Sequence, residues 1–259
     1  MQKPANLLKQ ERQALLLETL RREGKLLASE WSERFHVSED TVRRDLRELA
    51  REHKLQRVHR GALPRSKSLP AYAARQYQAP EAKRAIAAAA AKLVHDGQLL
   101  FVDGGTTTLQ LACHLPEELR ATVVTNSPAV AVALAMHPAV EVILLGGRLY
   151  KPAQVTVGAA AMEELRSFHA DVCFLGVCSV HPEVGLSIED FEEAHIKRAM
   201  INGSAEVAGL VIAENLGTAL PFVVAPVEAL TYLITDARDG DERLAPYGRL
   251  GLSVICAGS

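Results

Sequence analysis

The sequence predicts an N-terminal α-helical winged helix-turn-helix and a C-terminal α/β domain with a parallel, doubly wound sheet. A capped helix with exposed arginines begins near residue 38, and from about residue 99 short apolar strands alternate with helices. Residues 1–66 contain 15 Lys and Arg against 10 Asp and Glu, a net charge of +5. The remaining residues therefore carry −7, since the whole chain carries −2. This asymmetry indicates that only the N-terminal head meets nucleic acid.

Two amphipathic helices are expected before the recognition helix. The first covers residues 10–23, where Leu15, Leu16 and Leu20 form the buried face. The second is short and covers residues 28–35. A tight turn then leads into a third helix, as in a helix-turn-helix.

The third helix begins in residues 37–47, which read VSEDTVRRDLR. Ser38 is placed to cap it, because its side-chain oxygen can accept from free amides of the first turn. Val42, Leu46 and Leu49 recur at helical spacing and define a buried face, so the arginines of this segment lie outside it. A helix with this pattern suits insertion into a DNA groove.

A strand, a turn and a second strand are expected over residues 54–63, which form the wing. The alternative is an ordinary surface helix with solvated arginines, but spacing, cap, turn and wing agree with DNA binding. The expected DNA-binding residues are Ser38, Glu39, Thr41, Val42, Arg43, Arg44, Arg47, Arg57, His59 and Arg60.

The domain boundaries follow from composition. We expect the DNA-binding domain at residues 1–63, a proline-containing linker at 64–81, and the α/β domain at 82–259. Strands are expected at 99–103, 122–126, 140–147, 171–177, 206–213, 230–236 and 252–257. Helices are expected at about 81–95, 106–114, 128–136, 158–168 and 190–202.

Small polar residues follow the first three strands, where ligands bind in sheets of this kind. The first strand ends in residues 103–108, DGGTTT, whose glycines and hydroxyls suit an anion at the start of a helix. Residues 125–127 and 146–148 follow the next two strands. One shared crevice is therefore predicted; the alternative is that these residues serve only as loops and caps.

Several other classes of protein are disfavoured. No apolar run reaches the ~20 residues that span a membrane, and residues 1–10 contain no apolar signal segment, so a cytoplasmic protein is expected. The four cysteines show no paired spacing, so we expect reduced, buried thiols and no metal site. No cofactor is predicted.

These motifs together resemble the DeoR family of transcriptional regulators over nearly the whole chain. The matching segments are VSEDTVRRDL, RVHRGA, DGGTTT, VVTNS, LLGG, DVCFLGV, GLS and EEAHIKRAM. The resemblance implies a sensor domain similar to sugar-phosphate isomerase folds, which binds phosphorylated sugars or related metabolites. It implies that the effector pocket contains Asp103, Gly104, Gly105, Thr106, Thr107, Thr108, Asn126, Gly147 and Lys197. Lys197 could face phosphate or pair with Glu193, its i−4 neighbour.

The chain departs from the family pattern at two places. The wing has Arg60 where the family usually has glycine. Residues 213–217, AENLG, replace a segment that usually contains a lysine after the fifth strand. The missing cation weakens the expectation of an ordinary phosphosugar effector.

The leading hypothesis is a sequence-specific DNA-binding regulator, a repressor of a carbohydrate or related catabolic operon. Its partners would be operator DNA, a small-molecule effector and further copies of itself, because one winged head has too small an interface for specific affinity. One alternative is a sugar-phosphate isomerase-like enzyme with an attached head. Another is a regulator whose body serves only for oligomerisation. Acid–base groups for the enzyme would be Asp103, Glu192, Glu193, His195 and Lys197.

Overall fold

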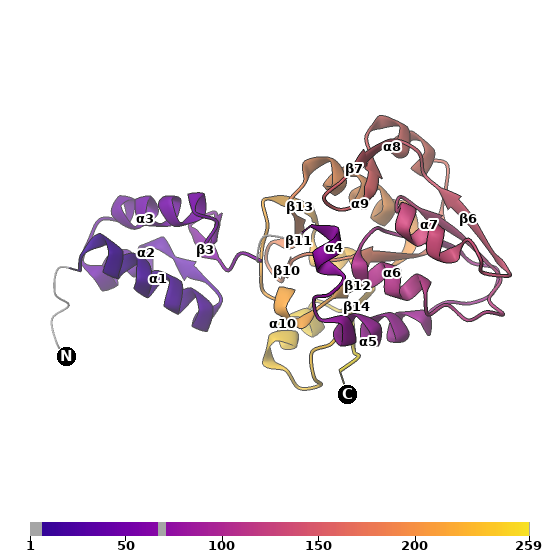
Figure 1. The fold of residues 1–259 in the computed structure, drawn as a ribbon. Helices are drawn as coiled ribbons and strands as arrows, with labels where there is room; N and C mark the ends of the chain where they lie inside the picture. The colour runs from indigo at the N-terminus through magenta and orange to yellow at the C-terminus, as the bar shows by residue number, and fades with distance from the viewer. Residues whose placement is uncertain (1–6, 67–70, 259) are drawn as a thin grey trace.

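The computed structural model describes residues 7–66 and 71–258, which form a small head and a larger body (Figure 1). The predicted winged helix-turn-helix is confirmed in the head. Its elements are α1 (Lys9–Glu23), β1 (Leu26–Leu27), α2 (Ala28–Phe35), α3 (Glu39–Arg51), β2 (Gln56–Val58) and β3 (Gly61–Leu63).

The head core lies between its three helices and the wing. Leu16 and Leu20 of α1 pack with Leu46 and Leu49 of α3, all at most 2% exposed. The prediction for Leu15 is wrong: it is 38% exposed, because it lies beside the stripe that Leu16 and Leu20 form. The strand β1 was not predicted; it pairs with β3 and completes a three-stranded sheet in the order β1-β3-β2.

The body is built on a seven-stranded sheet with all neighbouring strands parallel, and the predicted doubly wound α/β class is confirmed. The strand order is β15-β14-β12-β9-β4-β5-β6. Each strand corresponds to one of the seven predicted apolar segments. Their bounds are β4 (Leu99–Val102), β5 (Ala121–Thr125), β6 (Val140–Leu144), β9 (Ala170–Gly176), β12 (Ser204–Val211), β14 (Tyr232–Thr235) and β15 (Ser253–Cys256).

Helices cover both faces of this sheet and bury two separate cores. On one face α5, α6 and α7 pack over the sheet; on the other lie α8 and α9 (Figure 1). The helix bounds are α5 (Pro80–Ala91), α6 (Thr106–Ala112), α7 (Pro128–Leu134), α8 (Ala159–Leu165) and α9 (Phe191–Asn202). Near-continuous apolar strands follow from this double coverage.

The short elements of the body were not predicted, because two to five residues carry too little periodicity. The helix α4 (Tyr72–Arg75) even lies inside the expected linker. The remaining elements are β7 (Arg148–Tyr150), β8 (Val155–Val157), β10 (Val180–His181), β11 (Gly185–Ile188), η1 (Ala213–Asn215), β13 (Phe222–Ala225), η2 (Val227–Ala229), η3 (Glu242–Leu244) and α10 (Ala245–Arg249).

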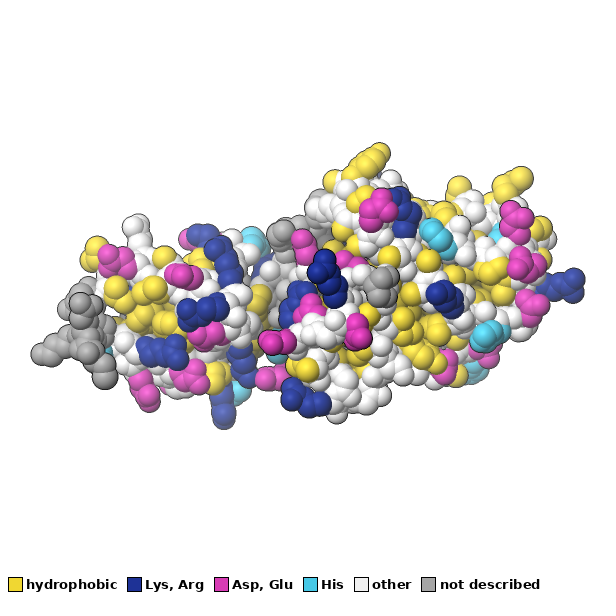
Figure 2. Space-filling model, turned by 90° about the horizontal axis from the view of Figure 1, so that it is seen from below, with side chains coloured by type: hydrophobic (Ala, Val, Ile, Leu, Met, Phe, Trp, Pro, Cys, Tyr) yellow, Lys and Arg dark blue, Asp and Glu magenta, His cyan; other side chains and the backbone are white. Residues whose placement is uncertain are grey.

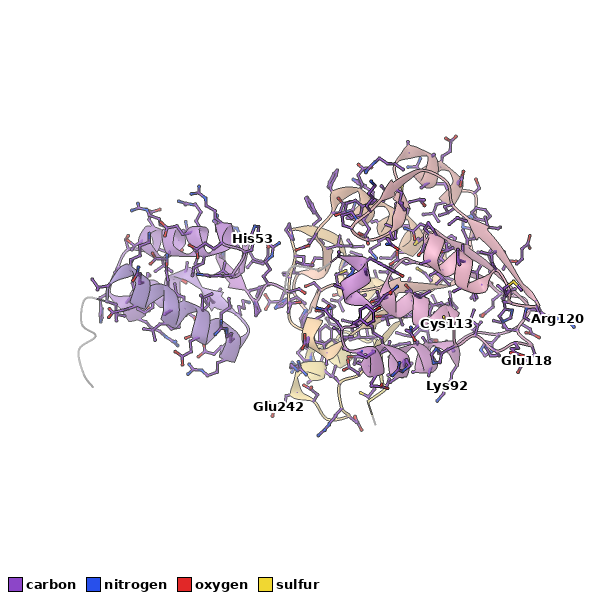
Figure 3. The ribbon with its side chains drawn as sticks, in the orientation of Figure 1. His53, Lys92, Cys113, Glu118, Arg120 and Glu242 are labelled. Atoms are coloured by element: carbon purple, nitrogen blue, oxygen red, sulfur yellow. The ribbon has the colours of Figure 1, made fainter. Side chains whose placement is uncertain are left out.

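The cysteines are all free, as expected. Their burial is only partly as expected: Cys173 is buried, but Cys113 is exposed just after α6, on the body and away from the head (Figure 3). No helix within residues 7–66 and 71–258 is long and apolar enough to cross a membrane.

Candidate functional site

The recognition helix α3 starts where the sequence places it. The Ser38 side chain accepts from the Thr41 amide at 3.2 Å, which satisfies one of the free donors of the first turn. Val42 was expected to touch DNA, and this is wrong: it is fully buried in the head core. Val42 therefore holds the helix in place instead of contacting a groove.

Two exposed ion pairs run along the outer face of α3. Arg43 pairs with Glu39 at 2.6 Å and Arg44 with Asp40 at 3.1 Å, each one turn apart, while Arg47 is also exposed. Exposed pairs of this kind contribute little to stability. The arginines are therefore free to exchange these carboxylates for phosphates. On the side of the head that Figure 2 shows from below, Lys and Arg side chains are interspersed with Asp and Glu.

A buried ion pair anchors α3 to α1, and sequence reasoning missed it. The Asp45 carboxylate accepts from Arg12 Nε at 2.8 Å, with side-chain exposures of 3% and 13%. In the sequence Asp45 stands between arginines and resembles a surface residue. Only the packing of α1 against α3 reveals its role, which is to fix the orientation of the recognition helix.

The wing tip has an unusual backbone. Arg57, His59 and Arg60 are exposed, and Arg60 has a φ of 70° in the left-handed region that favours glycine. The Arg60 carbonyl accepts from the Ala28 amide at 2.9 Å, which fixes this conformation. Strain of this kind persists where the surrounding structure holds the backbone in place.

Replacing Arg60 by glycine is expected to stabilise the fold by about 1 kcal/mol, because the left-handed conformation costs glycine nothing. The same change is expected to weaken DNA binding about tenfold, because a wing cation is lost. Chemical denaturation and titration of DNA selected from a random-sequence pool measure the two effects. Arg57→Ala is the control, since it removes a wing cation without relieving strain. Unchanged DNA affinity in Arg60→Gly would contradict the DNA-contact role.

A cavity lies at the carboxyl ends of β4 and β9, where the sheet order reverses direction. The connections that follow β4 and β9 lead in opposite directions and leave a crevice between them, which is where ligands bind in doubly wound sheets. The loop after β4 and the loop after β9 form two of its walls. The lining residues are Arg75, Gln78, Lys83, Gly104, Gly105, Thr106, Thr107, Gly176, Val177, Cys178, Glu193, Leu210, Ile212 and Asn215.

Four of the nine residues expected in the pocket line this cavity: Gly104, Gly105, Thr106 and Thr107. Gly104 must lack a side chain, because a Cβ there would lie 2.0 Å from Val155 Cγ1. The backbone can therefore approach closely at this wall.

Four other expected residues are buried behind the cavity instead of lining it. Asn126 accepts from the Gly104 amide at 3.1 Å and ties the ends of β5 and β4 together. Thr108 donates its hydroxyl to the Gly105 carbonyl at 3.1 Å. Asp103 and Lys197 pair with each other. These residues shape the wall that a ligand would meet.

Gly147 lies away from the cavity, so its expected place there is wrong. It follows β6, the edge strand, and a Cβ on it would lie 2.8 Å from the Val157 carbonyl oxygen. The packing of the loop before β7 requires a glycine at position 147, and no ligand is needed to explain it.

Lys197 is the centre of a buried charge cluster. Its Nζ contacts the Asp103 carboxylate, lies 3.5 Å from Glu193 Oε1 and donates to the Gly176 carbonyl at 3.0 Å. Asp103 also accepts from the Gly176 amide at 3.0 Å. Burial raises the pKa of Glu193, and the Lys197 charge opposes that rise. Of the two expectations for Lys197, pairing with Glu193 holds, and a second carboxylate joins it.

Two cations reach the cavity from segments in which no site was expected. Lys83 belongs to the alanine-rich α5, and Arg75 ends α4 in the expected linker. Lys83 is 6% exposed and donates to the Arg75 carbonyl. Burial, with a smaller contribution from the Arg75 charge, lowers the pKa of Lys83 to about 8. A lone lysine in an alanine-rich helix is the signal that could have found it.

The acid–base groups considered for an enzyme are only partly brought together. Asp103, Glu193 and Lys197 are adjacent, but Glu192 and His195 line a different groove beside α8. His195 packs edge-on against Phe191, with ring centroids 4.5 Å apart. Of the five acid–base groups expected for an enzyme, only Asp103, Glu193 and Lys197 therefore form a buried cluster beside the cavity.

The comparisons with known proteins agree with both parts of the fold. Residues 12–67 match the DeoR-like helix-turn-helix domain, and residues 78–237 match the DeoR C-terminal sensor domain. The chain is 31% identical over 229 residues to the HTH-type transcriptional repressor GlcR of Bacillus subtilis strain 168, covering 88% of each protein. It is 30% identical over 223 residues to the glycerol-3-phosphate regulon repressor of Escherichia coli strain K12, covering 86% of this chain and 88% of that one.

Among solved structures, ribose 5-phosphate isomerase A from Methanocaldococcus jannaschii aligns with 17% identity and a TM-score of 0.39 over 55% of each chain. The two domain matches together span most of the sequence, in the order that the motifs predict. The chain therefore belongs to the DeoR family of transcriptional regulators.

Proposed function

We propose that this regulator represses a carbohydrate or related catabolic operon, and that a phosphorylated sugar or related metabolite in the cavity controls its DNA binding. The names of its relatives support the class: one is a transcriptional repressor and another represses a glycerol-3-phosphate regulon. Residues 1–63 would bind the operator, and residues 82–259 would bind the effector and hold copies of the chain together.

The observation that carries the effector is the charge distribution of the cavity. Lys83 and Arg75 supply cations at one wall, and Glu193 supplies a carboxyl group at another. Cations suit a phosphate, and a carboxyl group suits a sugar hydroxyl. The family lysine that is missing near Asn215 is thus replaced in function by cations from α4 and α5.

The head supports a paired mode of DNA binding. A single recognition helix contacts one half-site, so two heads are needed for specific affinity. We propose a homodimer or higher oligomer in which Thr41 meets base edges while Arg43, Arg44 and Arg47 meet phosphates and a guanine.

Thermal stability measured against phosphorylated sugars, free sugars and sugar acids tests the effector. A ligand at about 100 times its Kd adds roughly 2.7 kcal/mol, which raises Tm by about 5–10 °C in a domain of this size. A selective shift by a phosphorylated compound supports the proposal. No shift with any compound would favour a body that serves only for oligomerisation.

Lys83→Ala is expected to weaken binding of the active phosphorylated compound about 10- to 100-fold, because a charged hydrogen bond to phosphate is lost. In the wild type, affinity should fall as pH rises above about 8, since the Lys83 pKa is lowered to about 8 and only the protonated amine attracts phosphate. Isothermal titration between pH 6.5 and 9.5 measures both effects.

Arg84→Ala is the matched control. Arg84 is the next residue of α5, exposed and paired with Glu81 outside the cavity. The Arg84→Ala variant should bind the compound as the wild type does and show the same pH dependence. Equal losses in the two variants would show that Lys83 acts through general charge and not in the site.

A further inference from the structure

The three residues that follow the wing, Pro64, Arg65 and Ser66 (the strap), are docked on the body. The Pro64 carbonyl accepts from the Ala219 amide at 3.1 Å, and Arg65 forms a parallel β-bridge with Ala219. The backbone of the strap is thus held to the body directly beside the point where the head leaves it (Figure 1).

Two side-chain contacts strengthen this docking. Arg65 Nη2 donates to Glu189 Oε1 at 3.0 Å, and Ser66 Oγ donates to Asn215 Oδ1 at 3.1 Å. The Arg65 side chain is 11% exposed and Ser66 is 5% exposed. Both contacts are partly buried, and we expect them to contribute more than the exposed ion pair between Lys25 of the head and Glu183 of the body.

Asn215, the partner of Ser66, is also part of the wall of the ligand cavity. Asn215 lines the cavity and ends η1, which follows β12. The loop beyond it is tightly bonded: the Thr218 hydroxyl donates to the Asn215 carbonyl at 2.8 Å, and the Gly217 amide donates to the Val180 carbonyl at 2.8 Å. The Asn215 side chain therefore stands between the cavity and Ser66.

Glu189, the partner of Arg65, is adjacent to another wall of the cavity. Glu189 directly precedes Asp190, whose side chain caps α9 by accepting from the Glu193 amide at 2.9 Å. Glu193 lines the cavity and lies beside Lys197. A ligand that shifts the first turn of α9 would therefore shift Glu189 as well.

We propose that the strap couples the cavity to the DNA-binding head through Asn215 and Glu189. A ligand that bonds to Asn215 or displaces Glu193 changes the docking of the strap, and with it the freedom of the head to take the spacing that DNA requires. The coupling is reciprocal, so DNA that favours one strap state changes ligand affinity by the same factor. The inference rests on the proposed function for the ligand class alone.

Tryptic cleavage of the Arg65–Ser66 bond in the full-length protein tests, without ligand or DNA, the docking through which this coupling would act. Cleavage requires Arg65 to leave its buried position, and its rate follows the undocked population when reclosing is fast. Asn215→Ala and Glu189→Ala each remove one contact without altering the cleaved sequence. Each is expected to raise the initial cleavage rate about two- to tenfold, as loss of one hydrogen bond implies, and the double variant more than either.

The controls separate strap docking from general loosening. Glu118→Ala changes an exposed residue of the body (Figure 3) that belongs neither to the strap contacts nor to the cavity lining, and it should leave the rate unchanged. The exposed Arg166–Ser167 bond at the end of α8 has the same cleaved dipeptide and serves as an internal reference. An unchanged rate at Arg65 in Asn215→Ala, or an equal rise at both bonds, would overturn the proposal. Failure to find an effector or DNA site would instead count against the proposed function.

Discussion

Replacing Arg43 and Arg44 by alanine is expected to weaken binding to the selected DNA at least about a hundredfold and to leave the fold intact. Each arginine that meets DNA contributes about 1–3 kcal/mol. Both side chains are exposed, and the ion pairs they form with Glu39 and Asp40 contribute little to folding. Gel shift and fluorescence titration measure the affinity, and circular dichroism the fold. The salt dependence should also decrease, since about two fewer counterions are released.

Arg21→Ala with Arg22→Ala is the matched control, because it removes the same charge from the head. Arg21 and Arg22 end α1 and face the junction with the body, not the exposed face of α3. Near wild-type affinity in this control would show that position matters and net charge does not. If the α3 variant still bound the selected DNA normally, the assignment of α3 as the recognition helix would be wrong.

The head could be predicted closely because its signals are local. Ser38 caps α3, and Val42, Leu46 and Leu49 are buried as their helical spacing requires. Local pattern fails where contact depends on a neighbouring helix. Asp45 is buried only because Arg12 on α1 faces it, and no spacing within α3 reveals that partner.

The cavity could be predicted only in part, since the order of the strands in the sheet was not readable from the sequence. All three polar strand ends were expected to meet, but β6 is the edge strand, and β5 separates it from β4. Asn126, which follows β5, therefore reaches the Gly104 loop, whereas Gly147, after β6, does not. Arg75 was missed for a different reason: the segment taken as a linker folds back over the switch point. Lys83 was missed because its contact with that segment depends on the same folding back.

Lys197→Met is expected to lower the free energy of unfolding by about 3–5 kcal/mol, because it leaves buried carboxylates without their cation. Lys197 is 2% exposed, contacts both Asp103 and Glu193, and donates a hydrogen bond to the Gly176 carbonyl. The corresponding fall in Tm is roughly 6–20 °C. Lys92→Met is the control, because Lys92 is exposed on the outside of the body (Figure 3) and should change stability by less than about 0.5 kcal/mol.

The loss in Lys197→Met should depend on pH in one direction. Burial raises the Glu193 pKa, and the Lys197 charge holds that rise in check, so the variant should have a still higher Glu193 pKa. A carboxyl group whose pKa is higher in the folded state stabilises the fold at low pH, and that contribution is lost as pH rises through the folded pKa. The difference from wild type should therefore be smaller at pH 5 than at pH 8. Adding Glu193→Gln to Lys197→Met should recover part of the loss at pH 8, since one unpaired buried charge is gone. A loss that is equal at both pH values and unaffected by Glu193→Gln would mean that Lys197 contributes packing, and that its charge does not organise the wall of the cavity.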